Sequence, residues 1–143
     1  MTSEVVIRPA RMTDYSSVVE GIGDVYWGRD YLPAKYTEFL QDPDFLCFVA
    51  EVDGEVVAFY LGELVDNRQT VDKRAGRVKD GYKGQGIFSK LSDTIEAEVT
   101  KLGTVKWEVM ACEKKVAERV SKGFTEKKGF ELIVHVVRTS QHQ

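Results

Sequence analysis

Cysteine is scarce in this chain, which argues against two kinds of stabilised fold. Cys47 and Cys112 are its two cysteines. They have neither the spacing of a metal site nor the density of a disulfide-stabilised scaffold. We therefore expect no metal site and predict that both are buried thiols in strands.

Long apolar runs and a leader-like start are also missing. The apolar stretches are much shorter than the ~20 residues that a membrane-spanning helix needs. The first residues, MTSEVV, lack a basic region followed by an apolar core, so we expect no secretory signal. A composition with 43% hydrophobic and 30% charged residues is ordinary for a soluble globular protein. We expect a cytoplasmic protein with no membrane partner.

An excess of positive charge is absent as well, since the formal net charge is −3. Affinity for a phosphate backbone comes from clustered lysine and arginine, so we expect no nucleic-acid partner. One local basic cluster stands out, made of Lys73, Arg74, Arg77, Lys79 and Lys83. It is interpreted either as a solvated strand edge or as a positive rim for a phosphorylated cofactor.

A length of 143 residues is that of one domain, so we predict a single domain over residues 1–143. A short first strand is expected over residues 4–8. Residues 14–26 carry apolar side chains at helical spacing, which predicts a helix with the Thr13 hydroxyl as its N-cap.

A second helix and a hairpin follow. Pro33 fits the first turn of the helix. Its predicted inner face is Tyr36, Phe39 and Leu40. Residues 45–51 and 55–65 are β-branched and aromatic runs joined by Asp53-Gly54, the dipeptide most typical of a two-residue hairpin turn. An antiparallel pair is therefore expected.

The central part of the chain predicts a strand, a loop and a helix. A polar turn at residues 66–68 leads to a strand over 70–79. The helix is expected over residues 87–102, with Gly103 as its stop. Its predicted apolar stripe is Phe88, Leu91, Ile95, Val99 and Leu102.

Residues 104–112 alternate as a strand does. One face would carry Val105, Trp107, Val109 and Ala111. Because a helix connects this strand to the strand over 70–79, the two should be parallel. A last helix is expected over 114–128 and a final strand over 130–138.

The stretch between strand and helix has the design of an anion site. Gly84 and Gly86 can take positive φ angles and let a ligand approach the backbone. The freed N–H groups would lie at the positive end of the helix that follows, where phosphates bind. The spacing excludes the P-loop and the dinucleotide-binding fingerprint. A plain strand–helix turn is the alternative.

Residues 77–88, with the sequence RVKDGYKGQGIF, resemble the acetyl-CoA loop of the GCN5-related N-acetyltransferase superfamily. Lys83 stands where that family usually has Gln or Arg, and Phe88 where it has a small residue. The predicted order of elements is also that of the family and covers nearly the whole chain. The resemblance implies an α/β (α+β) fold: a mixed, mostly antiparallel sheet with a parallel splayed pair, and helices on both faces.

A narrower resemblance lies in residues 28–36 (GRDYLPAKY) and 40–43 (LQDP). They resemble the histidine N-acetyltransferase subfamily of vertebrates and its relatives, whose members are longer. The stretch at 125–130 (TEKKGF) resembles the family's helix terminus, with Thr125 where many members place a tyrosine that acts as general acid.

The family resemblance implies that acetyl-CoA is the co-substrate. Its pantetheine arm would run beside β-strand residues, and its pyrophosphate would rest on the glycine loop. The implied cofactor-binding residues are Val78, Lys79, Lys83, Gly84, Gln85, Gly86, Ile87 and Phe88.

Acetyl transfer to an amine needs a group that removes a proton and a site that holds the acceptor. Glu63 and Glu108 are the candidate bases, because a carboxylate inside an apolar strand accepts protons more readily near neutral pH. The alternatives are a strand-end surface charge for Glu63 and a structural partner of Lys106 or a neighbouring strand for Glu108. The candidate acceptor-site residues are Trp27, Tyr31 and Tyr36, with a core role as the alternative.

Three function classes remain open. The first is an acetyl-CoA-dependent N-acetyltransferase for a small amine or amino acid, with histidine as the leading acceptor and a protein or peptide as another. The second is a non-catalytic acyl-CoA-binding or regulatory module, which Phe88 and Thr125 favour. The third is a nucleotide-phosphate-binding protein. A monomer or homodimer is expected.

Overall fold

The computed structural model describes residues 4–22 and 31–110. These residues contain one five-stranded sheet in the order β1-β2-β3-β4-β5. Its strands are β1 (Val5–Pro9), β2 (Phe45–Val52), β3 (Glu55–Val65), β4 (Thr70–Val78) and β5 (Trp107–Met110). The first four are antiparallel neighbours, and β5 is parallel to β4. The predicted mixed, mostly antiparallel sheet is confirmed.

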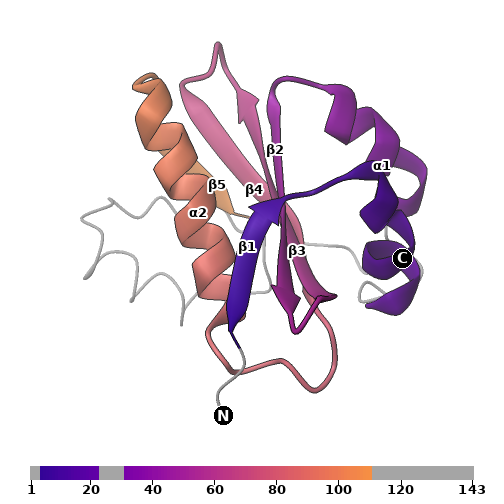
Figure 1. Cartoon of the computed structure of the whole chain (residues 1–143). Coiled ribbons are helices and arrows are strands. Elements are labelled where there is room, and N and C mark those ends of the chain that lie inside the picture. Colours follow the sequence, from indigo (N-terminus) through magenta and orange to yellow (C-terminus); the bar gives the residue numbers. More distant parts are fainter. Residues whose placement is uncertain (1–3, 23–30, 111–143) are drawn as a thin grey trace, which may run out of the picture. The chain divides into compact units, whose positions relative to one another are not determined.

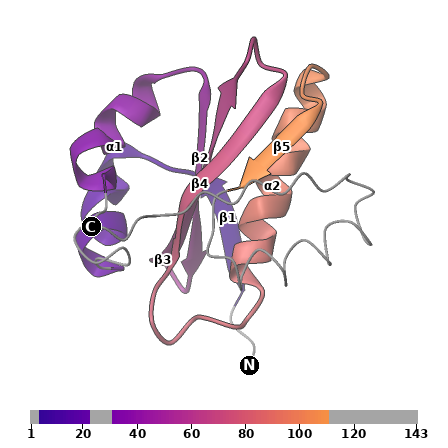
Figure 2. The ribbon, with the colours of Figure 1, turned by 180° about the vertical axis from the view of Figure 1, so that it is seen from behind.

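The two faces of the sheet carry different helices, as Figures 1 and 2 show. Helix α2 (Ile87–Leu102) packs on one face, and helix α1 (Leu32–Gln41) packs on the other together with the short η1 (Met12–Asp14) and η2 (Ser16–Gly21). Each face has its own apolar core. We call them the α2 face and the α1 face.

The chain divides into two compact units, Met1–Val109 and Met110–Gln143. All of the second unit except Met110 lies outside the described residues, so the single domain over 1–143 stays a prediction. The predicted helix over 114–128 and strand over 130–138 lie outside them too. In the described ranges, no helix has the length and apolar character that a bilayer crossing requires.

The predicted hairpin is confirmed. Strands β2 and β3 pair from Phe45 opposite Glu63 to Val52 opposite Glu55. Asp53 and Gly54 have φ angles of 51° and 82°, the left-handed pair that a tight hairpin turn requires. Cys47 is a buried free thiol in β2, as predicted, whereas Cys112 lies outside the described residues.

The predicted first helix is wrong in its form and its cap. Residues 12–14 form a 3₁₀ turn and residues 16–21 a π-helix, with Arg11 rather than Thr13 at the N-cap position. The reason is Asp14, whose buried carboxylate accepts hydrogen bonds from the Arg11 N–H (2.7 Å) and the Arg8 guanidinium (2.8 Å). These bonds keep the pKa of Asp14 below its usual value. Residues 23–26 lie outside the described ranges.

Helix α1 confirms the second predicted helix. Pro33 lies in its first turn, and Asp42 already has an extended backbone. Tyr36 and Phe39 are buried, and Leu40 is half-buried against the same core.

Helix α2 has the predicted bounds, and Gly103 ends it with a left-handed φ of 73°. Its predicted stripe is partly wrong, because Phe88 and Leu102 are 37% and 42% exposed. Ile87, not Phe88, takes the first inward position, and the residues that follow it at steps of four continue the buried row. The buried residues are Ile87, Leu91, Ser92, Ile95 and Val99.

Strand β5 is described over four residues of the predicted 104–112. The Gln69 carbonyl oxygen accepts hydrogen bonds from the N–H groups of Lys106 and Trp107. These bonds fix the start of β5 beside β4. Trp107 and Val109 are exposed, and Glu108 and Met110 point to the more buried side.

Strand β4 contains a bulge. Leu61 lies opposite Arg74, but Phe59 lies opposite Arg77, so one extra residue is inserted between these pairs. Ala75 in the bulge has a φ of 60°, which is left-handed. Phe59 and Leu61 both belong to the α1-face core. The bulge therefore brings Arg74 and Arg77, three residues apart, to the same face.

The start of α2 lies close to β4 through a glycine. A Cβ atom on Gly76 would lie 2.4 Å from the Phe88 ring and 2.9 Å from Tyr60. The Phe88 and Tyr60 rings are themselves in contact, with centroids 4.4 Å apart. The Phe88 ring thus occupies the space that a side chain at position 76 would fill.

We predict that Gly76→Ala lowers the free energy of unfolding by about 1–3 kcal/mol, because the new methyl group overlaps Phe88. In a Phe88→Ala background the same change should cost clearly less, since the ring is gone. Chemical denaturation of the four proteins measures both values.

Gly21→Ala is the matched control. Its Cβ would meet no atom closer than 3.8 Å, and the change should be close to neutral. Equal costs of Gly76→Ala with and without the Phe88 ring would contradict the packing account.

Candidate active site

The glycine loop connects β4 to α2, in the predicted order. Gly84 and Gly86 have φ angles of 79° and 78°, and a Cβ on either would meet no atom within 4 Å. Backbone conformation, not crowding, therefore selects glycine at both positions. Gly86 is the N-cap of α2 and supplies no side-chain cap. The first N–H groups of a 16-residue helix are thus available to an anion in front of the loop.

The charged side chains around the loop are exposed. Lys83 is 62% exposed and lies 3.1 Å from Asp80. Lys79 pairs with Glu55 next to it on the hairpin. The Gln85 amide donates to the Gly81 carbonyl at 3.2 Å, which closes the loop on itself. The loop combines uncapped N–H groups with an exposed cation.

The structure divides the basic cluster of the sequence. Lys73 and Arg77 are 0% and 3% exposed, so the interpretation as a solvated strand edge is wrong for both. Lys79 and Lys83 lie at the glycine loop. Arg74 has partners on the α1 face, described below.

Glu108 lies in a buried contact on the α2 face. It pairs with Lys73, whose Nζ also donates to the Ser92 hydroxyl at 2.8 Å. The Glu108 side chain is only 11% exposed. The contact joins β5, β4 and α2, which agrees with the alternative that Glu108 is the partner of a neighbouring strand.

Glu63 lies on the α1 face in a cluster of polar groups. Its carboxylate is 2.6 Å from Arg74 Nη2, and Asp72, directly opposite Glu63 in the β3–β4 ladder, is 3.1 Å from Nη1. Arg74 Nε donates to the Tyr31 hydroxyl at 2.9 Å. We call Tyr31, Glu63, Asp72 and Arg74 the arginine cluster.

Aromatic rings support the arginine cluster. The Phe39 and Phe45 rings are stacked, with centroids 4.3 Å apart and an angle of 10°. The central carbon of the Arg74 guanidinium lies 5.6 Å from the Phe45 centroid and 5.9 Å from that of Tyr31. Such distances are those of cation–π contacts and hold the guanidinium in place.

The pKa of the Asp72 carboxyl is shifted upward by its surroundings. Burial raises this pKa, the Arg74 guanidinium opposes the shift, and the Glu63 carboxylate adds to it. Burial raises the pKa of the Tyr31 hydroxyl too, and Arg74 opposes this shift as well.

The three predicted acceptor-site residues differ in their places. Tyr31 belongs to the arginine cluster and is 41% exposed. Tyr36 is 1% exposed, and its hydroxyl donates to the Arg11 carbonyl at 2.7 Å, so it is a core residue, as the alternative had it. Trp27 and the general-acid position Thr125 lie outside the described residues.

Sequence reasoning missed Asp72 and Arg74 as site residues. The available signal was the strand register, because Asp72, which lies opposite Glu63, and Arg74, two residues further along β4, must share the face of Glu63. The run of charges from Asp72 to Arg74 hid this, since neighbouring residues point to opposite faces.

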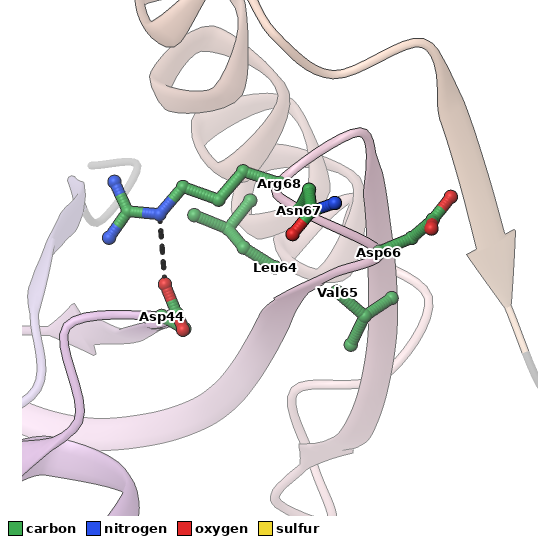
Figure 3. Close-up of a pocket in the computed structure, with 6 residues that line it drawn as sticks. All are labelled: Asp44, Leu64, Val65, Asp66, Asn67 and Arg68. Atoms are coloured by element: carbon green, nitrogen blue, oxygen red, sulfur yellow. Dashed lines mark hydrogen bonds and ion pairs between the residues drawn. The ribbon is translucent and has the colours of Figure 1, made fainter.

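An open surface hollow lies near the turn between β3 and β4 (Figure 3). Arg68 and Asp44 pair across it at 2.9 Å. Asp66, Asn67 and Arg68 all have left-handed φ angles, which makes the turn. The hollow lies at the start of β4, whereas the glycine loop follows the end of β4. The hollow and the glycine loop are therefore separate. Its lining residues are Asp44, Leu64, Val65, Asp66, Asn67 and Arg68.

Two curated proteins are similar to part of the chain. Histidine N-acetyltransferase of Scomber australasicus is 31% identical over 78 residues, which are 54% of this chain and 23% of that protein. Probable N-acetyltransferase 16 of Homo sapiens is 32% identical over 78 residues, 54% of this chain and 21% of that protein. The match thus spans less than a quarter of the length of these relatives.

Solved structures are similar to the fold. Aminoglycoside N-acetyltransferase AAC(6')-Iy in complex with CoA superposes with a TM-score of 0.72 at 17% identity, over 100% of this chain and 98% of that one. The ribosomal-protein-S18-alanine N-acetyltransferase of Escherichia coli gives 0.68 at 16% identity, over 85% of this chain and 76% of that one.

The sequence also matches a family model directly. The model is that of the acetyltransferase (GNAT) family, and the match covers residues 12–130, well over half of the chain. The arrangement of strand, glycine loop and helix described above lies inside the matched range. The chain therefore belongs to the acetyltransferase (GNAT) family.

Proposed function

We propose that the protein is an N-acetyltransferase that moves an acetyl group from acetyl-CoA to the amine of a small molecule. The observation that carries the proposal is the glycine loop in front of α2, within a fold and family of acetyltransferases. Relatives with this fold have been solved with CoA bound.

The residues of the loop fit a cofactor with phosphate groups. Left-handed Gly84 and Gly86 leave room for a ligand against the backbone, and the uncapped N-terminus of α2 favours negative charge. Lys83 would add a positive charge from the side, and Val78 and Lys79 would border the pantetheine arm. The bound acetyl-CoA would supply an acetyl group activated as a thioester.

The arginine cluster would serve the acceptor. An amine with a pKa well above neutral arrives protonated and must lose a proton before it can attack. Glu63 is our proposed base, directly or through a water, because it lies on the partly exposed α1 face beside Tyr31 and Arg74. Glu108 is the less exposed of the two carboxylates, 11% against 26% for Glu63, and it pairs with the buried Lys73 on the other face.

A free amino acid is the proposed acceptor, with histidine first. The support is the similarity to proteins named histidine N-acetyltransferase, together with the resemblance of residues 28–36 to that subfamily. Solved relatives include enzymes named for aminoglycosides and for a ribosomal protein, so these are the competing acceptors.

We predict that replacing both Gly84 and Gly86 by valine weakens CoA binding at least tenfold, about 1.4 kcal/mol, because left-handed φ angles and close approach are lost together. Isothermal titration with CoA measures the affinity. Gly103→Val is the matched control, because it introduces the same strain at the opposite end of α2, where φ is 73°. The loop assignment is wrong if the double variant and the control bind CoA equally well.

CoA release with a panel of acceptors tests the function itself. We expect release with histidine or another free amino acid, and much less with an aminoglycoside or an N-terminal peptide. Release with peptides alone would overturn the small-molecule acceptor. Binding of CoA without release for any acceptor would favour a non-catalytic acyl-CoA-binding module.

We predict that Glu63→Gln lowers kcat by on the order of 10² to 10⁴ and leaves CoA affinity unchanged, because the amide keeps the shape but accepts no proton. Stopped assays of CoA release measure kcat, and isothermal titration with CoA measures the affinity.

Glu38→Gln is the control, since Glu38 is an exposed carboxylate on α1 that is paired with Lys35. It should leave kcat unchanged. If kcat falls by this factor with Asp72→Asn or Glu108→Gln and is retained with Glu63→Gln, our choice of base is wrong.

A further inference from the structure

The arginine cluster presents charges of both signs to solvent. The Arg74 and Glu63 side chains are each 26% exposed, and Asp72 is 32% exposed. They come from two adjacent strands, and Tyr31 is added from the start of α1. The cluster is therefore fixed by the fold and yet accessible.

Arg74 retains hydrogen-bonding capacity. A guanidinium has five N–H groups. The described part of the chain provides one acceptor each to Nε, Nη1 and Nη2, namely Tyr31, Asp72 and Glu63. Each terminal nitrogen carries two hydrogens and can therefore donate to a second acceptor. A ligand carboxylate is such an acceptor, and its bonds to a guanidinium are charge-assisted.

The charges of the cluster are nearly balanced. Two carboxylates, Glu63 and Asp72, face Arg74, and the bulge brings Arg77 to the same side. The Arg77 charge acts on Tyr31, where it opposes the effect of burial on the hydroxyl pKa. Neither a polycation nor a polyanion is matched to such a surface, because each would meet a like charge.

The charges of a zwitterion are complementary to those of the arginine cluster. An α-amino acid carries an ammonium and a carboxylate on one carbon, and Arg74 and Glu63 are a contact pair of opposite charges at 2.6 Å. The amino acid can lie against this pair with each of its charges next to an opposite one. No charge is then left desolvated without a partner.

The cluster is also near the cofactor loop. Arg74 and Val78 lie in the same strand, four residues apart with the bulge between them, and the loop begins directly after Val78. An acceptor at Arg74 and a cofactor at the loop would share one strand.

We propose that Arg74 determines acceptor specificity by binding the α-carboxylate of a free amino acid, while the amino group faces Glu63 and Asp72. This rests on the proposed N-acetyltransferase function and names its substrate class. Tyr31 is a positioning residue, which holds the Nε edge of the guanidinium. The stacked Phe39 and Phe45 rings support its plane.

The test compares an amino acid with its amide, which keeps the amine and lacks the carboxylate charge. For histidine and histidinamide, and for the same pair of each other amino acid in the panel, the parent should have a kcat/KM ratio well above one. Arg74→Gln should reduce the ratio by on the order of tenfold to a hundredfold, mainly through the KM for the acid. Because both substrates are measured on one sample, partial unfolding does not change the ratio.

Arg68→Gln is the matched control, because Arg68 is also an exposed arginine paired with an aspartate, and it lies in the turn before β4, at the opposite end of that strand from the glycine loop. Its ratio should equal that of the parent. Tyr31→Phe removes one hydroxyl and is the milder variant, and we expect a smaller reduction of the ratio with it.

Binding keeps the test independent of turnover. Titration of histidine and histidinamide into the CoA-bound protein should show tighter binding of histidine, and Arg74→Gln should remove the difference. Equal binding of acid and amide by the parent, or an unchanged difference in the variant, overturns the role of Arg74. A protein that distinguishes the two ligands and releases no CoA with any acceptor would instead overturn the N-acetyltransferase function.

Discussion

The change of register at Ala75 is the constraint on which the arrangement of both faces depends. A left-handed alanine costs roughly 1–2 kcal/mol, so the bulge persists only because packing on both sides favours it. Before the bulge, Lys73 points to the α2 face and Arg74 to the α1 face. After it, Arg77 returns to the α1 face, and Gly76 provides the space for Phe88. One extra residue thus links the arginine cluster to the start of α2.

The neighbouring cations Lys73 and Arg74 have different partners, which lie on opposite faces of the sheet. Lys73 is fully buried, and its contacts with Glu108 and Ser92 compensate its desolvation while they attach β5 to β4 and α2. Removing one member of such a buried pair typically costs about 3–5 kcal/mol. The pairs of Arg74 are partly solvated and individually weaker. The polar contacts on the α2 face are therefore closed to solvent, whereas those on the α1 face are partly open to it.

Local signals in the sequence were sufficient to predict most helices and strands, but not the arginine cluster. Asp53-Gly54 predicted the hairpin, and the glycines at both ends of α2 predicted the bounds of that helix. These residues have left-handed backbones, which end helices and strands. The N-cap was predicted at Thr13, because nothing in the local sequence indicates that the Asp14 carboxylate accepts hydrogen bonds from Arg8 and Arg11. Asp72 and Arg74 lie before the bulge, where the register from the turn places them on the face of Glu63, but the unbroken run of charges from Asp72 to Arg74 did not indicate which of them share that face. The contact with Tyr31 could not be predicted, because Tyr31 is distant in sequence.

The bulge has a consequence for how sequences of this family are compared along β4. Leu61 opposite Arg74 and Phe59 opposite Arg77 lie on one face, so the bulge takes up its extra residue without changing the faces of the residues on either side of it. A relative that lacks this one residue would have a regular strand with the same side chains on the same faces. A gap of one residue between positions 74 and 77 of an alignment is thus compatible with an unchanged arginine cluster, whereas a gap elsewhere in β4 would turn the side chains beyond it to the opposite face.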